Sequence, residues 1–281
     1  MIDVLKPGRY INNEWNAVHK EWNDGALKIA LSFPDVYEIG MSHLGMRILY
    51  GILNREQDVI CERVFAPWLD MEKRLRDKKE KLCSLESSHA LKEFNIIGFS
   101  LQYEMNYLDI LNMLDLGGVP LCSKDRGDND PIVIAGGPCA FNPEPLADFI
   151  DMFVIGEAEE VILEIAKLVK GLRLKVTDYR NEILKALARI EGVYVPRHGQ
   201  PRRLPIWVTS EVDHVRKRII KDLDNSYFPT DIVVPYIQIV HDRIGIEIMR
   251  GCPHECKFCQ ACKIFHPFTI RSVKRIMEIA E

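Results

Sequence analysis

The sequence lacks a long uninterrupted apolar run, a charged leader followed by an apolar core, and an excess of charge of either sign. The first two absences argue against a membrane-spanning helix and a secretion signal, so we expect a cytoplasmic protein. A formal net charge of -4 over 281 residues argues against a chain-wide electrostatic attraction to nucleic acid or anionic membranes.

A disulfide framework is also not indicated, although the chain has 8 cysteines. Four of them fall within residues 252–262, and the others stand singly in apolar surroundings, at Cys61, Cys83, Cys122 and Cys139. We expect these four scattered residues to be small buried hydrophobes. Thiolates are soft ligands, so a tight group of them in a chain without a secretion signal indicates a metal before it indicates disulfides.

The clustered thiols follow an apolar, alternating run at 244–249, which predicts a buried strand with the cysteines on the loop at its C-terminal end. Cys252, Cys256 and Cys259 are separated by three and then two residues. This spacing lets one short loop reach three corners of a cubane iron–sulfur cluster and leaves one iron open. A four-ligand zinc site or a closed electron-transfer cluster stays open as an alternative, with Cys262, His254 or His266 as further ligands.

The segment C-x3-C-x-aromatic-C, formed by Cys252, Cys256, Phe258 and Cys259, resembles the signature of the radical S-adenosylmethionine (SAM) superfamily. The resemblance implies a 4Fe-4S cluster whose open iron chelates SAM, with Phe258 close to the adenine. It also implies reductive cleavage of the sulfonium to a 5′-deoxyadenosyl radical, with electrons from a donor such as flavodoxin or ferredoxin. Residues 241–281 would then begin a radical SAM partial (β/α) barrel.

Residues 26–170 alternate between strand-like and helix-like segments. Ser42 can cap the first helix. The alternation predicts an α/β fold, a flavodoxin-like doubly wound parallel sheet whose ligands bind at the C-terminal ends of the strands. The expected strands are 27–33, 59–64, 95–101, 131–135 and 151–156, and the expected helices are one beginning near Ser42 and those at 71–81, 107–116 and 157–169.

The loops at these strand ends carry small or polar residues, and their order upstream of the cysteines resembles the cobalamin-binding domain of a large radical SAM subgroup. The resemblance implies cobalamin as a further cofactor. A tight turn would equally explain the paired glycines. The cobalamin-binding residues expected from it are Ser42, His43, Leu44, Gly45, Ser100, Leu101, Gly136, Gly137, Pro138 and Gly156.

One departure from that pattern concerns the lower ligand of cobalt. Domains that supply a histidine use an Asp-x-His-x-x-Gly loop, whereas the segment from Asp35 to Gly40 has Tyr37 at the histidine position. We therefore expect cobalamin without a protein imidazole ligand. His43 is out of register, and it is either a helix-start residue or an axial ligand.

The remaining segments are a lead-in arm at 1–25, expected to pack on the first domain, and a bridging segment at 171–240 with a helix at 179–190 and a short strand at 192–196. A basic loop at 197–203 and the cluster Arg216, Lys217, Arg218 and Lys221 leave a nucleic-acid contact open. After the cysteines, 272–281 is expected to be an amphipathic helix. A barrel needs more strand–helix units, so we expect the N-terminal piece of a longer enzyme, inactive without the remaining barrel.

The expected activity is radical modification of an unknown substrate, with cobalamin-dependent methylation as one form of it. A second hypothesis keeps the cluster but assigns the N-terminal domain to a substrate or RNA. A third makes the chain a non-catalytic cobalamin- or metal-binding scaffold. Retention of cobalamin separates the first two hypotheses, and reductive cleavage of SAM separates both from the third.

Overall fold

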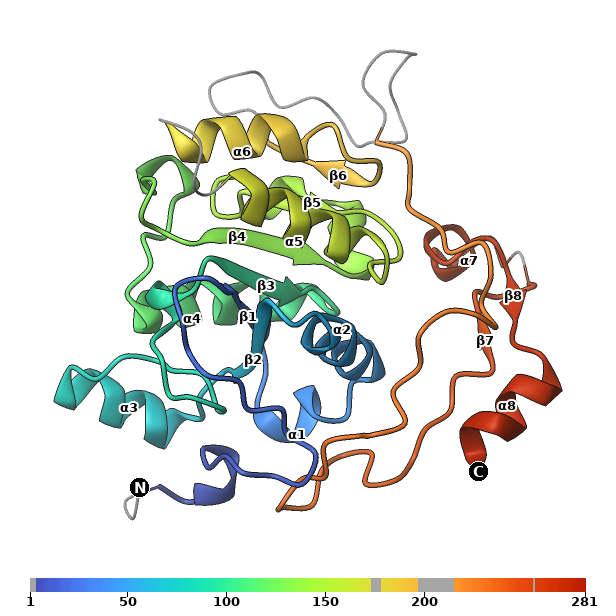
Figure 1. Cartoon of the computed structure of the whole chain (residues 1–281), viewed down its shortest axis with the longest axis horizontal. Helices are drawn as coiled ribbons and strands as arrows, with labels where there is room; N and C mark the ends of the chain where they lie inside the picture. Colours follow the sequence, from blue (N-terminus) through green and yellow to red (C-terminus); the bar gives the residue numbers. More distant parts are fainter. Residues whose placement is uncertain (1–3, 173–177, 197–214, 255) are drawn as a thin grey trace.

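The computed structural model describes residues 4–172, 178–196, 215–254 and 256–281. A six-stranded sheet in the order β2-β1-β3-β4-β5-β6 forms its centre (Figure 1). The first five strands are parallel and β6 runs antiparallel to β5, which confirms the flavodoxin-like prediction. The strands are β1 (Leu27–Phe33), β2 (Val59–Phe65), β3 (Ile96–Ser100), β4 (Ile132–Gly136), β5 (Met152–Val154) and β6 (Val193–Tyr194).

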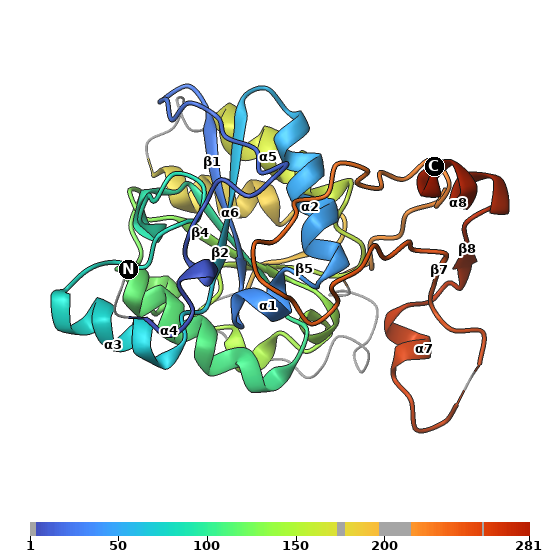
Figure 2. The ribbon, with the colours of Figure 1, turned by 90° about the horizontal axis from the view of Figure 1, so that it is seen from below.

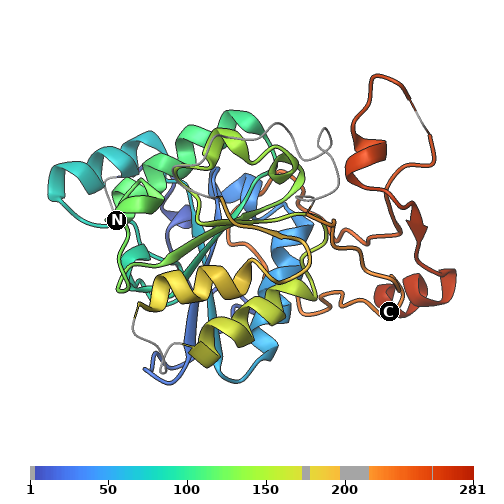
Figure 3. The same cartoon turned by 90° about the horizontal axis from the view of Figure 1, so that it is seen from above.

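Helices cover both faces of the sheet because alternate side chains along each strand point to opposite faces. Ile29 and Leu31 of β1 join the core beneath α2 (Leu44–Arg55), α5 (Val161–Leu172) and α6 (Tyr179–Leu187). Ala30 joins the core beneath α3 (Leu69–Lys78) and α4 (Tyr107–Gly117). Figure 3 shows these two groups of helices on opposite sides of the sheet. All seven residues of β1 are therefore buried, as expected for a strand covered on both faces.

Several predicted boundaries are shifted. A short helix α1 (Tyr37–Gly40) follows β1, and α2 is capped by His43 rather than by Ser42. Helix α5 begins at Val161 instead of 157, because the preceding residues form a loop at the end of β5. Short 3-10 helices lie at Pro7–Arg9, Leu91–Glu93, Glu104–Asn106, Ser123–Asp125, Pro138–Phe141 and Glu144–Leu146.

The N-terminal arm packs on the sheet domain through buried charges. Glu14 forms an ion pair with Arg63 of β2 at 2.5 Å, and both side chains are almost fully buried. Arg9 pairs with Glu38 of α1 at 2.8 Å. These pairs hold the arm beside α1 and the C-terminal end of β2.

The C-terminal segment consists of β7 (Met249–Arg250), α7 (Ala261–Ile264), β8 (Thr269–Ile270) and α8 (Val273–Ala280). Figure 2 shows that these elements lie to one side of the sheet domain. The predicted buried strand at 244–249 is wrong over most of its length, since only Met249 of it is in a strand and Ile244 is 78% exposed. Within the described residues β7 pairs only with β8, antiparallel, in a ladder of two residues.

Two further expectations concern the scattered cysteines and membranes. Cys61 and Cys139 are buried as predicted, whereas Cys83 and Cys122 are only half-buried. Among the helices of the described ranges, none has the length and apolar character needed to cross a bilayer.

Candidate cofactor site

A cavity of about 410 Å³ lies where the strand order reverses, at the C-terminal ends of β1, β3, β4 and β5. Ligands of doubly wound sheets bind at this switch point because the loops there diverge and leave a crevice. Six predicted cobalamin residues line the cavity, namely His43, Leu44, Gly45, Gly137, Pro138 and Gly156. The sequence therefore located most of one wall of this cavity.

The other four predicted residues shape the loops and are not part of the lining. The Ser42 hydroxyl donates to the carbonyl of Glu38 and accepts the N–H of His241. Ser100 Oγ accepts a hydrogen bond from Gln102 Nε2 at 2.9 Å. Leu101 is buried, and Gly136 is the last residue of β4.

His43 caps a helix and faces the cavity at the same time. Its Nδ1 atom accepts the backbone N–H of Met46 at 3.1 Å, and its ring also hydrogen-bonds the side chain of Gln102. Burial lowers the pKa of His43, which the hydrogen bond with Gln102 opposes, so the imidazole is neutral near pH 7. The Nδ1 atom is thus engaged as the cap of α2, which favours the helix-start role over the axial-ligand role.

Tyr37, at the position of the missing histidine, is buried and points toward the N-terminal arm. Its hydroxyl donates to the carboxylate of Glu14, which also pairs with Arg63. Burial raises the pKa of Tyr37, and the hydrogen bond to Glu14 raises it further. This side chain is therefore a structural contact of the arm.

Gly137 has a backbone conformation that only glycine adopts easily. Its φ angle is +116°, and a Cβ atom there would lie 2.6 Å from the carbonyl oxygen of Leu101. The tight-turn explanation for the paired glycines therefore applies here. The same lack of a side chain leaves the backbone of Gly137 open to the cavity.

The opposite wall comes from the segment that leads into the cysteines. Met249, Arg250 and Gly251 line the cavity, with Glu247 from the same segment. Their neighbours across the cavity are Glu157 and Glu159, which follow β5, and Lys217 of the bridging segment. Burial lowers the pKa of Lys217, while its ammonium donates to the carbonyls of Ile264 and His266.

Sequence reasoning did not assign a site role to Gln102, Glu157, Glu159 or Arg250. The signal was their position in segments that carry the resemblance, since Gln102 and Glu157 follow two predicted strands and Arg250 precedes Cys252 by two residues. Nothing in the sequence placed residues 157–159 against residue 250. That contact required the fold.

The cysteine loop presents its thiols on the surface. Cys252 and Cys256 are exposed, Cys259 is half-buried, and Phe258 is 93% exposed. The N–H of Cys259 donates to the carbonyl of Cys256 at 3.0 Å, which turns the loop back on itself. Three accessible thiols on one short loop are a donor set that suits an iron–sulfur cluster. In the described part of the chain, however, no three Cys, His, Asp or Glu side chains are gathered closely enough to hold a metal ion.

Cys262 differs from the other three thiols. It is buried, and its Sγ atom donates to the carbonyl of Cys259 at 3.1 Å. The side chain thus fills space behind the loop. Its role as a fourth ligand stays a prediction to test.

The basic bridging residues lie partly outside the described residues, since 197–203 is not covered. Within the covered part, Arg216 pairs with Glu191 at 3.3 Å, and Arg218 pairs with Glu160 at 3.2 Å and with Glu164. The guanidinium of Arg218 is thus engaged within the protein, whereas the Arg216 side chain is 88% exposed.

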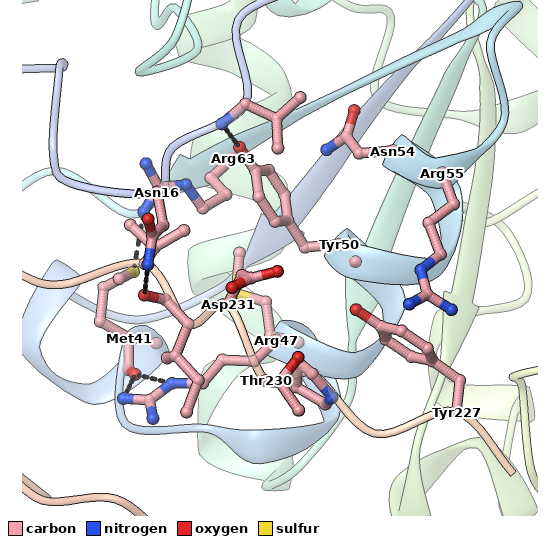
Figure 4. A pocket seen from close by; sticks show the side chains of 17 residues that line it. Asn16, Met41, Arg47, Tyr50, Asn54, Arg55, Arg63, Tyr227, Thr230 and Asp231 are labelled. Carbon is pink, nitrogen blue, oxygen red and sulfur yellow. Dashed lines mark hydrogen bonds between the residues drawn. The ribbon is translucent and has the colours of Figure 1, made fainter.

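A second cavity, of about 180 Å³, lies between α2 and residues 227–233 (Figure 4). Most of its polar side chains already bind the protein itself. Asn16 donates to the carbonyl of Ile232 at 3.0 Å, Arg47 donates to that of Met41 at 2.6 Å, and the Tyr50 hydroxyl accepts the N–H of Val18. The larger cavity at the strand ends is therefore the better candidate site.

Comparison with known proteins gives a family for the chain. Residues 45–196, more than half of the chain, match the family described as radical SAM proteins, N-terminal. This chain belongs to that family. The matched region of the radical SAM protein begins at Gly45 and includes all the predicted loops from there to Gly156.

Two curated proteins are similar to this radical SAM protein. An uncharacterized protein of Methanocaldococcus jannaschii is 25% identical over 256 residues, which are 90% of this chain and 45% of that protein. The anaerobic magnesium-protoporphyrin IX monomethyl ester cyclase of Cereibacter sphaeroides is 24% identical over 140 residues, 48% of this chain and 20% of the cyclase. The chain thus spans less than half the length of either relative. No solved structure matches it significantly.

Proposed function

We propose that this radical SAM protein holds cobalamin at the C-terminal edge of its sheet and a SAM-binding 4Fe-4S cluster on the adjoining cysteine loop, for radical methylation of a substrate. One observation carries the proposal. Met249, Arg250 and Gly251, which lead directly into Cys252, line the same cavity as the loops of the flavodoxin-like domain. A ligand in that cavity would therefore lie against the base of the cysteine loop.

Cys252, Cys256 and Cys259 would hold the cluster, which when bound supplies an electron for cleavage of SAM. Phe258, exposed between the last two of these cysteines, would cover the adenine. The protein's own contribution is to position both cofactors and to exclude water from the space between them.

The cavity would hold part of a corrinoid, against the loops that follow β4 and β5. Gly137 and Gly156 offer backbone without side chains in these loops. Because His43 and Tyr37 are engaged in hydrogen bonds within the protein, neither would ligate cobalt. The similarity to an anaerobic cyclase is in keeping with chemistry carried out without oxygen.

The test is anaerobic reconstitution of the 281-residue chain with iron and sulfide, followed by gel filtration in the presence of hydroxocobalamin. We expect four irons per chain, an electron paramagnetic resonance (EPR) spectrum of the reduced cluster that shifts when SAM is added, and cobalamin that co-elutes with the protein. Zinc in place of iron would contradict the cluster assignment, and a spectrum indifferent to SAM would contradict an open iron that binds SAM in this chain. A SAM-responsive cluster without retained cobalamin would favour the substrate-binding alternative for the first domain.

A further inference from the structure

Arg250 lies at the centre of a charged network between the sheet domain and the cysteine loop. Its guanidinium is 2.6 Å from a carboxylate oxygen of Glu159, which follows β5, and 2.8 Å from Glu247 on its own segment. Glu157 lies 3.5 Å away on a third side. All these side chains are largely buried, with 13% of the Arg250 side chain and 12% of the Glu159 side chain exposed.

The network continues beyond Arg250 into the rest of the C-terminal segment. Glu247 also accepts a hydrogen bond from Arg271 at 3.1 Å. Arg271, at the end of β8, is 1% exposed and donates to the carbonyl of Leu223 at 2.6 Å. The chain of contacts from Glu159 to Leu223 thus ties three separate segments together.

The residue after Arg250 supports the same arrangement. Gly251 has a φ angle of +82°, and a Cβ atom there would lie 2.5 Å from the carbonyl oxygen of Phe265. The chain returning from the cysteine loop therefore packs directly against the backbone of Gly251. Lys217 makes a second attachment, through the carbonyls of Ile264 and His266. The start of the cysteine loop is thus tied to the sheet domain through Arg250, and its end is tied to the bridging segment through Lys217.

Two properties make Arg250 suited to this position. A guanidinium presents several N–H groups in a rigid planar fork, so it can bind Glu159 and Glu247 at once, whereas a lysine ammonium is a single point charge. Cys252 follows after Gly251, so displacement of the Arg250 backbone moves the first thiol of the loop. The contacts of Arg250 therefore determine where the thiols stand relative to the cavity.

We infer that Arg250, through Glu159, is the positioning residue that fixes the cysteine loop against the cofactor cavity. It determines the position of the cysteine loop relative to the flavodoxin-like domain. It does not itself take part in the reaction. Its influence on cobalamin rests on the proposed function, whereas its influence on the loop does not.

The experiment compares R250Q, R250K and E159Q with the wild-type chain by two measurements. The first is hydrogen exchange, by mass spectrometry, of the peptide containing the Arg271 amide, which donates to the carbonyl of Ile248 at 2.9 Å. Amides of β3 and β4 in the sheet serve as the internal reference. The second is the Kd for hydroxocobalamin, from quenching of protein fluorescence.

We expect exchange at the Arg271 peptide to quicken about tenfold in R250Q and E159Q, with β3 and β4 unchanged, and the Kd for hydroxocobalamin to rise about tenfold. R250K should resemble R250Q, because one ammonium cannot replace the fork. R275Q is the matched control, since it removes the exposed pair between Arg275 and Glu278 in the same C-terminal segment and should change neither measurement.

Unchanged exchange at the Arg271 peptide in both R250Q and E159Q would overturn the inference. So would faster exchange throughout the sheet, since that would make Arg250 a general stabilising residue. If the loop alone loosens but the wild-type chain binds no hydroxocobalamin, the positioning role stands and the proposed cobalamin function fails. E159Q leaves the guanidinium of Arg250 in place. If R250Q does not fold, exchange at the Arg271 peptide in E159Q tests the inference instead.

Discussion

The Nδ1 atom of His43 accepts a hydrogen bond from the backbone N–H of Met46, 3.1 Å away, and so caps α2. The same imidazole lines the cavity at the strand ends. His43 caps α2 through Nδ1, and its ring also interacts with the side chain of Gln102. The imidazole therefore has little freedom to ligate a metal. The same cap is therefore the reason why we expect no cobalt ligand from His43 if cobalamin binds here.

Replacement of His43 by alanine should lower the free energy of unfolding by about 1 kcal/mol, because one N–H at the start of α2 loses its partner. Urea denaturation followed by circular dichroism measures this. H43N is the control, since an asparagine oxygen can cap the helix and should keep most of the stability. The absorption spectrum of bound hydroxocobalamin should be the same in wild type and H43N, and a lost nitrogen-ligated cobalt signal would contradict the structural reading.

The lowered pKa of His43 predicts how the stability of the protein depends on pH. The folded state disfavours the protonated imidazole, so between the folded pKa and the unfolded value of about 6.5 the unfolded chain binds more protons. The contribution of His43 to the free energy of unfolding therefore falls as the pH drops below about 6.5, and it is constant above that pH. The stability difference between wild type and H43N should follow this course in urea titrations from about pH 5 to 7.5. A difference independent of pH would contradict it.

The sheet was predictable because its strands are apolar over lengths that periodicity detects, and β1 is buried at every position. The candidate cavity was predictable in part, because strand ends of a parallel sheet meet at one edge. The apolar–polar alternation at 244–249 was misleading. Such a pattern shows that one face of a segment could be buried, but it does not show whether neighbouring strands are there to pair with it. The pairing of Arg250 with Glu159 was not predictable, because charge and spacing along the chain say nothing of which loops meet.

Replacement of Gly137 by alanine should destabilise the protein by about 1–3 kcal/mol, because the backbone there is left-handed and a Cβ atom would clash with the Leu101 carbonyl. The matched control is G127A, at a glycine where a Cβ atom would meet nothing within 4 Å. Thermal unfolding of both variants gives the comparison. Equal midpoints for G137A and G127A would mean that the turn after β4 tolerates a side chain.

The four clustered cysteines should differ in their effect on iron content, because Cys262 is buried and the other three are at least partly exposed. C252A, C256A and C259A should each lose most of the iron after anaerobic reconstitution, since each removes one of the three proposed ligands to the cluster. C262A should keep its iron and its SAM-dependent EPR shift, because Cys262 Sγ donates to the Cys259 carbonyl within the fold and needs no metal. Its expected cost is a loss of stability of about 1 kcal/mol from lost packing. If C262A loses iron as completely as C259A, Cys262 completes a closed site, and a four-ligand zinc or electron-transfer centre would replace the open-iron assignment.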